Sequence, residues 1–511
     1  MAKHAPDLAL LAAPLDPDAS TPLYRQLYDA IRKAILIGRF APGARLPSTR
    51  ALADELSLSR NTVALAFDQL FAEGYLEGRI GSGTYVSRAL PDELLHAEPA
   101  THAGPTNEPA ILPSAPATPS RALSQRGRET SELRVYSPYD LSHGIRPFVT
   151  GVPAVDAFPM ETWTRVAGKA WHKLTAHDLS YGDPAGFWPL RKAIAERLRE
   201  ARAVRCDPEQ VIVVGGTQQA IDVIAHTLIN PGDTVCIEDP VYLGASAGLT
   251  KAGARLAPIP IDSEGLRVAD ARVLDTLPRL VFVAPSYQYP TGVTMSLARR
   301  LALLDWARRT GVWVIEDDYD CEFRYSGRPL ASLQSLDEDR RVIYVGTFSK
   351  SLLPALRLGF VVAPPDLVDA FRSARAVSDR HVNTLEQAAL ADFIQEGHFD
   401  QHLRRMRTLY LERQEALLDI AQHLWAGLIE MQPGHAGLHV VGRLEPGCDA
   451  QHIARQAAAQ GVTVIPLSAF ASRPLSRDGL ALGYAAYTPR DLRKAAARLT
   501  PILERAHLAT D

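Results

Sequence analysis

Apolar residues recur three and four positions apart in the first predicted element of the chain, residues 22–40. This spacing predicts an amphipathic helix whose apolar stripe faces a core. Thr21 is expected to cap its N-terminus, Pro22 to take its first helical position, and Gly38 to end it. The apolar positions of the stripe are Leu23, Leu27, Ala30, Ile31, Ala34 and Ile35.

Two further helices and a short hairpin are predicted directly after it. Residues 46–56 have helical spacing with Ser48 as N-cap, and residues 59–76 have it with Ser59 as N-cap. Residues 75–87 alternate around a Gly-Ser-Gly turn, which predicts two short antiparallel strands. Three helices and a hairpin in this order are the layout of a winged helix-turn-helix domain. The positions of the third helix expected to face inward are Val63, Phe67, Leu70 and Phe71.

A proline-rich segment separates this region from the rest of the chain. Between Pro91 and Pro138 there are eight prolines in 48 residues, mixed with Ala, Ser, Thr and Gly, and no apolar periodicity. Such a segment buries too little apolar surface to offset the entropy lost on ordering it. We therefore predict an N-terminal domain over 20–88, an extended linker over 89–139 and a second domain over 140–511.

Strand-like and helix-like runs alternate from residue 140 onward, which predicts an α/β domain with a largely parallel sheet. Strands are expected near the starts of the segments 210–229, 278–292 and 311–325. The first of these continues through a Gly-Gly turn into a helix that opens at Thr217, and the free amides of such a helix start suit an anion.

Composition places the chain among soluble globular proteins, with 46% hydrophobic and 22% charged residues. A chain of 511 residues is too long for one ordinary hydrophobic core, so two or three domains are expected. The net charge of −3 gives no overall attraction to nucleic acid. Four scattered cysteines without a CxxC pair argue against disulfides or a zinc site. No apolar run reaches membrane-spanning length, and the short run at 8–15 lacks the basic flank of a signal peptide. We expect a cytoplasmic protein without a metal site.

Local charge makes residues 20–88 the candidate DNA-binding region, because they carry nine Lys and Arg against six Asp and Glu. The start of the third predicted helix is where a recognition helix presents side chains to base edges. The alternative is a small protein-binding domain whose arginines are simply solvated. Residues expected at the base edges are Ser59, Arg60, Asn61 and Thr62, and those expected to hold the backbone or form the wing are Arg45, Ser48, Arg50, Arg79 and Gly81.

The segment "GARLPSTRALADELSLSRNTVALAFDQLFAEGYLEGRIGSGTYVS" resembles the GntR-type winged helix along its whole length. The resemblance implies that the N-terminal domain binds double-stranded operator DNA. It carries DNA contacts to Arg50, Ser59, Arg60, Asn61, Thr62 and Gly81.

A single lysine in "VGTFSKSLLPALRLGF", residues 345–360, raises a question of chemistry. Lys350 lies between small hydroxyl residues, and Arg357 follows seven positions later. The plain interpretation is a lysine at a loop tip and an arginine that extends its head into water. The other interpretation is a Schiff-base lysine beside a phosphate clamp.

An acidic cluster around Tyr319, in "EDDYD", favours the second interpretation. On its own the cluster also fits a solvated strand end or a divalent-metal site, although no histidine or ordered calcium-loop pattern accompanies it. A phosphate cradle, an acid with a tyrosine, and a lysine with a downstream arginine are together what pyridoxal 5′-phosphate needs. The lysine must lose its proton, the acid must keep the pyridine nitrogen protonated, and the arginine must hold the phosphate.

Residues 140–511 resemble the fold-type I aminotransferases over nearly the whole domain. The resemblance implies a mostly parallel sheet with a smaller α+β C-terminal subdomain, and it makes Lys350 the Schiff-base lysine. Asp317 becomes the partner of the pyridine nitrogen and Tyr319 the phenol. The remaining cofactor-binding residues that it implies are Gly216, Thr217, Gln218, Tyr242 as the stacking ring, Thr347 and Arg357.

A winged helix joined by a linker to an aminotransferase-like domain resembles the MocR/GabR-type regulators of the GntR family. That resemblance implies a transcription regulator that senses a small-molecule effector through its cofactor. It also implies a head-to-tail homodimer in which each DNA-binding domain packs on the partner's large domain.

Several positions depart from the amino-acid-binding pattern of related aminotransferases. Ala481, in "LALGYAAY", stands where an arginine would dock a carboxylate. After the stacking ring, where some amino-acid-sensing regulators of this type carry another arginine, "VYLGAS" has Leu243 and Gly244. Tyr289 replaces the asparagine of the usual NPTG segment. A small apolar residue cannot replace an arginine–carboxylate pair, so we expect a poor α-amino-acid transaminase. The two arginines that would supply a substitute contact are Arg146 and Arg473.

Two functions from different classes follow. The first is a cofactor-dependent regulator with little or no turnover, whose signal is pyridoxal phosphate itself or an amine without the usual carboxylate. The second is a working aminotransferase with an appended DNA-binding domain. The missing arginine favours the first, while the intact lysine, aspartate and tyrosine permit the second.

Overall fold

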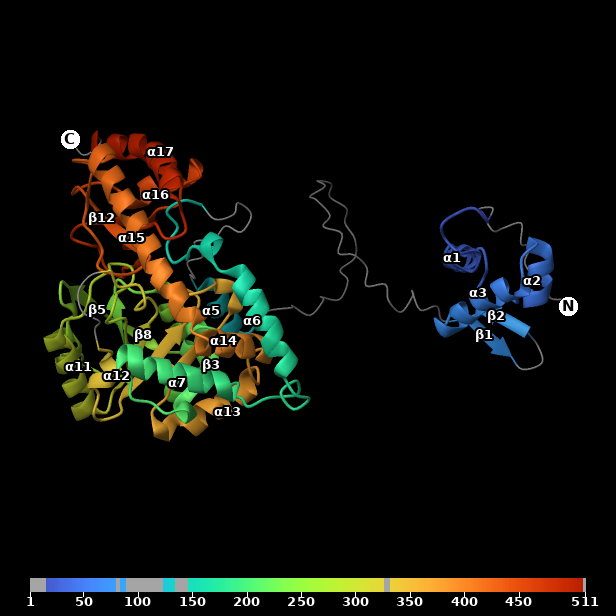
Figure 1. The fold of residues 1–511 in the computed structure, drawn as a ribbon, viewed down its shortest axis with the longest axis horizontal. Coiled ribbons are helices and arrows are strands. Elements are labelled where there is room, and N and C mark those ends of the chain that lie inside the picture. Colours follow the sequence, from blue (N-terminus) through green and yellow to red (C-terminus); the bar gives the residue numbers. More distant parts are fainter. Residues whose placement is uncertain (1–14, 80–82, 89–122, 134–145, 326–330, 509–511) are drawn as a thin grey trace, which may run out of the picture. The chain divides into compact units, whose positions relative to one another are not determined.

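A computed structural model describes residues 15–79, 83–88, 123–133, 146–325 and 331–508 of the chain. The chain separates into two compact units, with the division between residues 119 and 120. Each unit has its own core, and each is described by itself (Figure 1). Within the described ranges, no helix combines the length and apolar character needed to span a bilayer.

The smaller unit packs three helices against a two-stranded hairpin. Ser48 caps α2 by accepting the Ala51 N–H, and Ser59 caps α3 by accepting the Thr62 N–H. Both caps agree with the sequence prediction, as does the hairpin, in which β1 pairs antiparallel with β2. The elements are α1 (Leu23–Leu36), α2 (Thr49–Leu56), α3 (Arg60–Ala72), β1 (Leu76–Arg79) and β2 (Gly83–Val86).

Several local predictions were wrong. Pro22, and not Thr21, is the N-cap of α1 and makes no side-chain cap, because its extended backbone (ψ 143°) leaves the first helical position to the next residue. Phe71 is 36% exposed, because it lies at the edge of the apolar stripe beside Gly78, which has no side chain to cover it. Part of the predicted linker is helical: α5 (Gln125–Glu132) begins where Ser124 accepts the Gly127 N–H.

The larger unit is built on an eight-stranded mixed sheet with helices on both faces (Figure 1). Strands β4, β5, β7, β8 and β9 are mutually parallel, while β10 runs antiparallel to its neighbours β3 and β9. The expectation of a largely parallel sheet is therefore confirmed. In spatial order the strands are β3 (Val211–Val214), β10 (Gly359–Val362), β9 (Val342–Thr347), β8 (Trp313–Asp318), β7 (Leu280–Val283), β4 (Thr234–Asp239), β5 (Arg255–Asp262) and β6 (Gly265–Leu266).

The helices of this part enclose the sheet, and the central strands are accordingly apolar on both faces. Opposite faces of β3 contribute to two separate core clusters. The helices are α6 (Met160–Lys173), α7 (Trp188–Arg202), α8 (Thr217–Leu228), α9 (Leu243–Lys251), α10 (Val268–Arg272), α11 (Leu297–Thr310), α12 (Leu333–Leu336), α13 (Val368–Ser378) and α14 (Thr384–Gln395).

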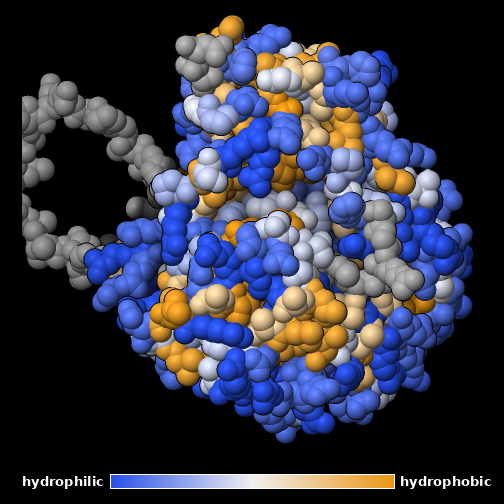
Figure 2. Space-filling model, turned by 90° about the vertical axis from the view of Figure 1, so that its left-hand side faces the viewer, coloured by the Kyte–Doolittle hydropathy of each residue, from blue (hydrophilic) through white to orange (hydrophobic). Residues whose placement is uncertain are grey.

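A smaller α+β subdomain completes the larger unit, as predicted. It is a four-stranded antiparallel sheet of order β11-β12-β14-β13, and its core is continuous with that of the main sheet. Figure 2 shows a mostly hydrophilic face of the larger unit, with apolar side chains gathered in separate patches. The elements are α15 (His398–Leu424), β11 (Ile429–Met431), β12 (His439–Leu444), α16 (Ala450–Ala459), β13 (Ile465–Pro466), β14 (Gly479–Gly483) and α17 (Pro489–Leu508).

Candidate cofactor and DNA-binding sites

A cavity of about 380 Å³ lies where the parallel strands end. The carboxyl ends of such strands, where the chain turns into its loops, are where α/β sheets bind ligands. The predicted cofactor residues Gly216, Thr217, Gln218, Tyr242, Asp317, Tyr319, Thr347, Lys350 and Arg357 all line this one cavity.

Strand β8 divides its acidic residues between the two faces of the sheet. Successive side chains of a strand point to opposite faces, so Glu316 and Asp318 share one face and Asp317 points to the other. Glu316 accepts the Leu333 and Gln334 N–H groups at the start of α12 (2.7 and 2.8 Å). The strand end is buried, so the solvated interpretation of this cluster was wrong.

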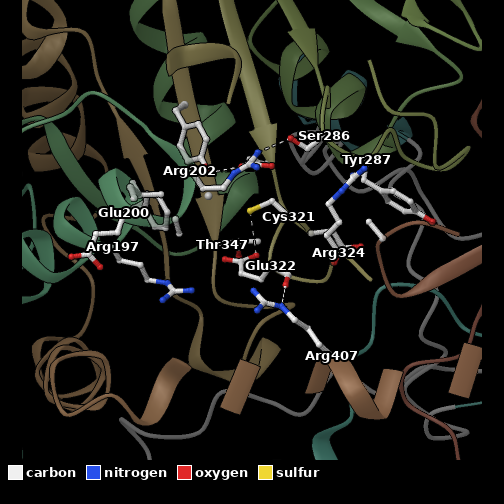
Figure 3. A pocket seen from close by; sticks show the side chains of 18 of the residues that line it. Arg197, Glu200, Arg202, Ser286, Tyr287, Cys321, Glu322, Arg324, Thr347 and Arg407 are labelled. Atoms are coloured by element: carbon white, nitrogen blue, oxygen red, sulfur yellow. Dashed lines mark hydrogen bonds and ion pairs between the residues drawn. The ribbon is translucent and has the colours of Figure 1, made fainter. Parts of the chain in front are cut away.

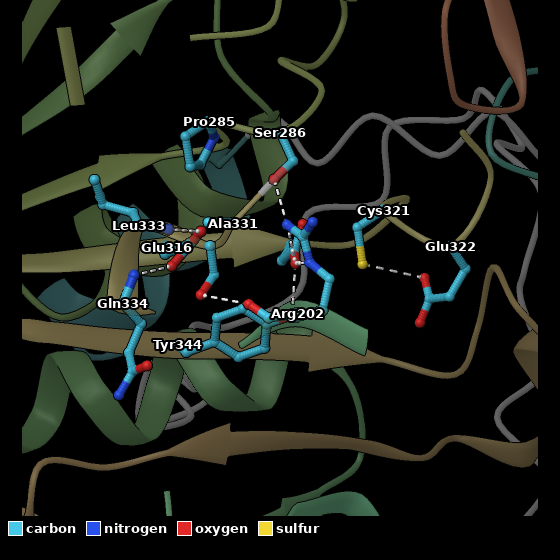
Figure 4. A network of polar contacts seen from close by, with 12 residues as sticks. Arg202, Pro285, Ser286, Glu316, Cys321, Glu322, Ala331, Leu333, Gln334 and Tyr344 are labelled. Atoms are coloured by element: carbon cyan, nitrogen blue, oxygen red, sulfur yellow. Dashed lines mark hydrogen bonds and ion pairs between the residues drawn. The ribbon is translucent and has the colours of Figure 1, made fainter. Parts of the chain in front are cut away.

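Asp318 contacts Arg202 and Tyr344 in a buried polar network, of which Figure 4 labels these two partners. Its carboxylate accepts from Arg202 (2.9 Å) and from the Tyr344 hydroxyl (2.5 Å), and Arg202 also donates to Ser286 (2.8 Å). Burial raises the pKa of Asp318, but the Arg202 guanidinium and the hydrogen bond from Tyr344 outweigh it, so that the pKa lies below its usual value and the carboxylate stays ionised. These contacts fix the end of β8, and they leave Asp317 to face the cavity.

Asp317 and Tyr319 present unsatisfied polar atoms to the cavity. Asp317 Oδ1 and Tyr319 Oη are buried and have no hydrogen-bond partner among the described residues. Burial, followed by the charge of Asp318, raises the pKa of Asp317 to about 7. Burial also raises the pKa of Tyr319 well above 10. Unpaired buried polar groups are rare and costly, so these two atoms are suited to pair with the polar groups of a bound ligand.

Lys350 follows β9 and points its amine into the cavity. Its Nζ donates to the Gly151 carbonyl at 2.8 Å. A Cβ on residue 151, whose φ is +74°, would lie 2.8 Å from the amine, so a glycine is required there. Burial lowers the pKa of Lys350 below 10.5, while the charges of Asp320 and Asp317 oppose the shift. A lowered pKa increases the fraction of nucleophilic free amine.

The opposite part of the lining is suited to an anion. Gly216 precedes α8 with a φ of +113°, and a Cβ there would lie 3.4 Å from Arg357 Nη2. The Thr347 hydroxyl, at the end of β9, lines the same cavity and contacts Ser349 Oγ at 3.1 Å. Helix N-terminal amides, a guanidinium and hydroxyls are the usual donors to phosphate.

Tyr242 precedes α9, and its ring occupies the space beside Gly244. A Cβ on residue 244 would overlap the Tyr242 ring, so no larger side chain fits while the ring holds this position. Gln218 Nε2, in α8, donates to the Gly244 carbonyl at 3.0 Å and ties the start of α9 to α8. Tyr289 lies edge-on to Tyr242 and to Tyr319, each at 6.2 Å between ring centroids.

Neither arginine expected to replace the absent carboxylate contact reaches the cavity. Arg146 donates to the Ala458 carbonyl, and Arg473 donates to the Pro258 carbonyl, and neither lines the cavity. Ala481 is fully buried behind Phe470, and does not line the cavity. The expectation of a substitute arginine was therefore wrong for these two residues.

Several lining residues carry chemistry that the sequence did not assign to the site. Glu238, in β4, is buried, and its pKa is raised to about 8, mainly by desolvation. Asp320 is buried with an unpartnered Oδ1, and His439, in β12, has its pKa lowered to about 4 by burial. Only Asp320 had a sequence signal, its place in the acidic cluster. Glu238 and His439 are brought to the cavity by strand order and by the C-terminal subdomain.

A second cavity of about 390 Å³ adjoins the first, and Asp320 and Thr347 line both. Figure 3 shows its polar lining, which comes from α7, the loop after β8, and α15. Arg407 Nε donates to the Glu322 carbonyl at 2.6 Å across this cavity. The described residues contain no group of three or more His, Cys, Asp or Glu arranged to hold a metal ion.

In the smaller unit, the predicted DNA-contacting residues lie mainly at the start of α3. Arg60 and Asn61 are exposed, and the Ser59 hydroxyl lies 2.8 Å from that of Thr62. Three more of these residues are exposed: Arg45 and Ser48 before α2, and Arg50 within it. The backbone of Arg45 forms an isolated antiparallel β-bridge with Tyr85 of the hairpin. Arg79 ends β1, and Gly81 lies outside the described residues.

Comparisons with known proteins match both units. Residues 151–499 match the family "Aminotransferase class I and II", and residues 23–86 match "Bacterial regulatory proteins, gntR family". The chain is 41% identical over 482 residues to a probable rhizopine catabolism regulatory protein, MocR, of Rhizobium meliloti, covering 94% of this chain and 93% of that one.

Two further similarities extend this picture. The HTH-type transcriptional regulator TauR of Rhodobacter capsulatus is 33% identical over 496 residues, which is 96% of this chain and 98% of that one. Among solved structures, the α-aminoadipate aminotransferase LysN of Thermus thermophilus, complexed with N-(5′-phosphopyridoxyl)-L-leucine, superposes with a TM-score of 0.68 at 29% identity. That match covers 75% of this chain and 98% of LysN.

Proposed function

This chain belongs to the MocR-type transcriptional regulators, which join a gntR-family DNA-binding domain to an aminotransferase class I and II domain, and from that membership we propose how it senses its signal. It binds pyridoxal 5′-phosphate in the cavity around Lys350, and a small-molecule effector reaches the cofactor there. The state of this cavity then sets how the N-terminal domain binds its operator.

The unsatisfied atoms of Asp317 and Tyr319, facing the same cavity as the Lys350 amine, are the observation that carries this proposal. Pyridoxal phosphate has a ring nitrogen for Asp317 and a hydroxyl group on the ring for Tyr319, so it satisfies both orphaned groups. The donor set around Gly216, Thr347 and Arg357 fits its phosphate. The residues present therefore fit the cofactor.

When bound, pyridoxal phosphate supplies an aldehyde carbon on which one primary amine exchanges reversibly for another, without oxidation or reduction. Lys350 would supply the protein amine that holds this carbon, because its Nζ points into the cavity. Asp317 keeps a proton at the ring nitrogen, and the Tyr242 ring covers one face of the cavity. Gly216, Thr217 and Gln218 supply helix N-terminal amides to the phosphate.

The N-terminal domain is proposed to read operator DNA through the start of α3. Ser59, Arg60, Asn61 and Thr62 face the base edges, while Arg45, Ser48, Arg50, Arg79 and Gly81 hold the backbone or form the wing. The domain limits proposed are 20–88, 89–139 and 140–511.

We also propose a head-to-tail homodimer for this protein. Large apolar side chains are exposed along residues 160–188, and such side chains on a soluble domain favour an interface. They are Met160 (56%), Trp171 (44%), Leu179 (63%), Tyr181 (77%) and Trp188 (46%).

The test of the cofactor is the visible absorbance of the purified full-length protein with added pyridoxal phosphate. A protein-bound band is expected, and Lys350→Ala is expected to abolish it. Lys251→Ala is the matched control, because Lys251 is an exposed lysine of α9 paired with Asp222, and it should keep the band. A wild-type protein without a band would overturn the proposal.

The same samples separate a sensor from an enzyme. For a sensor, an effector changes the band without release of a carbonyl product. A steady release of keto acid or aldehyde at the rates of aminotransferases, abolished by Lys350→Ala, would instead make this chain an enzyme with a DNA-binding domain.

A further inference from the structure

The charges that line the cofactor cavity restrict which effector it accepts. Among the described lining residues the cations are Lys350 and Arg357, and both are committed to the cofactor in the proposed function. Beside them lie the buried carboxyl groups of Glu238, Asp317 and Asp320, and burial raises the pKa of each. An effector carboxylate would enter a buried site without a counter-charge, which is strongly unfavourable.

At the two chain positions where related proteins carry an arginine, residues 481 and 244, the surrounding packing leaves no room for a cationic side chain to reach the cavity. Ala481 is enclosed by Leu467 and Phe470, so Phe470 and not residue 481 forms the wall. Gly244 is covered by the Tyr242 ring, which leaves no room for a side chain. The apolar and glycine residues at these positions are therefore part of a packed wall.

Asp320 is the acidic group best placed to meet an effector. It is 2% exposed, its Oδ1 has no hydrogen-bond partner among the described residues, and it lines the cavity together with Lys350. It exerts the largest charge effect on the pKa of Lys350, ahead of Asp317. The same cavity is also lined by Thr150 and Tyr289, whose hydroxyl groups contact each other at 2.9 Å.

We propose that the effector is a primary amine without an acidic group, and that Asp320 receives its second polar group, an ammonium or a hydroxyl. This inference rests on the proposed function, because the first amine reaches the cofactor at Lys350. Burial raises the pKa of Asp320 to about 7, so a carboxylate beside it would face like charge whenever Asp320 is ionised. A hydroxyl or ammonium instead satisfies its unpaired oxygen. Diamines and amino alcohols are the class defined by this chemistry.

Pairs of compounds that differ by one carboxylate test the inference. The pairs are 1,5-diaminopentane with lysine, 2-aminoethanol with serine, and 4-aminobutanol with 4-aminobutanoate. Each is titrated into full-length protein loaded with pyridoxal phosphate, and the change of the visible band gives the half-saturating concentration. In at least one pair the amine is expected to saturate at a concentration roughly tenfold lower than its acid, or lower still.

The ratio of the two half-saturating concentrations, acid over amine, measures this preference. Asp320→Asn is expected to bring the ratio toward one by weakening the binding of the amine, and Asp320→Glu is expected to restore part of it. Asp275→Asn is the matched control, since Asp275 is exposed and lines neither cavity, and it should leave the ratio unchanged. The ratio is taken within each variant, so incomplete cofactor loading does not alter it.

The outcomes separate this inference from the function on which it rests. Wild-type protein without a cofactor band contradicts the proposed function itself. A normal band with the acids binding as well as the amines, or better, in every pair overturns only the effector class. An amine preference that persists in Asp320→Asn contradicts the proposed role of Asp320. If that variant fails to fold, the wild-type ratio alone decides the effector class.

Discussion

Asp317 destabilises the folded protein as long as nothing neutralises it. Its carboxyl is buried beside Asp318, and its pKa rises from 3.8 to about 7. The folded state therefore keeps a proton that the unfolded state has released between these pH values. Stability falls as pH rises through that window, and the full penalty, at most about 4 kcal/mol, is present above pH 7. The protonated ring nitrogen of a bound cofactor would offset it.

We expect Asp317→Asn to stabilise the cofactor-free protein and to abolish cofactor binding. An amide has no charge to desolvate, so the midpoint of thermal unfolding should rise by about 3 °C or more at pH 8 and by less at pH 5. Thermal unfolding of the cofactor-free protein at both pH values measures this. The exposed Asp275→Asn is the control. If the midpoint of Asp317→Asn at pH 8 were equal to or lower than that of wild type, the buried carboxyl would not destabilise the folded protein.

The sequence predicted one part of the candidate site and missed another for a physical reason. Lys350 and Tyr319 lie in segments with their own pattern, so they were found. Glu238 and His439 lie in ordinary strand sequence, and only strand order and the closing C-terminal subdomain bring them to the cavity. The division of Asp317 from Asp318 follows from strand alternation, but which face holds the ligand is a tertiary property.

Helix α3 joins a local signal to a function. Its Ser59 cap is visible in the sequence because an N-cap depends on residues three apart. Local signals of this kind placed the helices and the hairpin of the smaller unit. They failed where burial is decided by a neighbouring element, as for Phe71 beside Gly78, and where a helix lies inside a polar segment, as for α5.

The exposed side chain of Arg60, in the first turn of α3, is expected to contact a DNA phosphate or base. Arg60→Ala should weaken binding of the full-length protein to its operator, and loss of a phosphate contact should reduce the slope of log K against log salt by about one. Arg25→Ala is the control, because Arg25 lies in α1 and pairs with Asp29. Fluorescence anisotropy over a salt series measures both. Equal affinity and slope for Arg60→Ala and wild type would contradict the proposed docking of α3.

At the scale of the whole molecule, signal and response lie in different units. All the described residues that line the cofactor cavity belong to the larger unit, and the predicted DNA contacts belong to the smaller one. The smaller unit also has a core of its own, formed by all three helices and the hairpin. It therefore contains what it needs to fold, but none of the residues proposed to sense the effector.

A fragment of residues 15–88 is therefore expected to bind operator DNA weakly and without regulation. In the proposed dimer two such domains engage two half-sites, and joining them raises affinity by about 10²-fold to 10⁴-fold over one domain alone. The fragment should lose that factor, and neither pyridoxal phosphate nor an effector amine should change its binding. Full-length Lys350→Ala is the control, because it keeps both units and loses only the cofactor response. A fragment that binds as tightly as the full-length protein would show that the larger unit contributes no second DNA-binding domain, and the proposed dimer would be wrong.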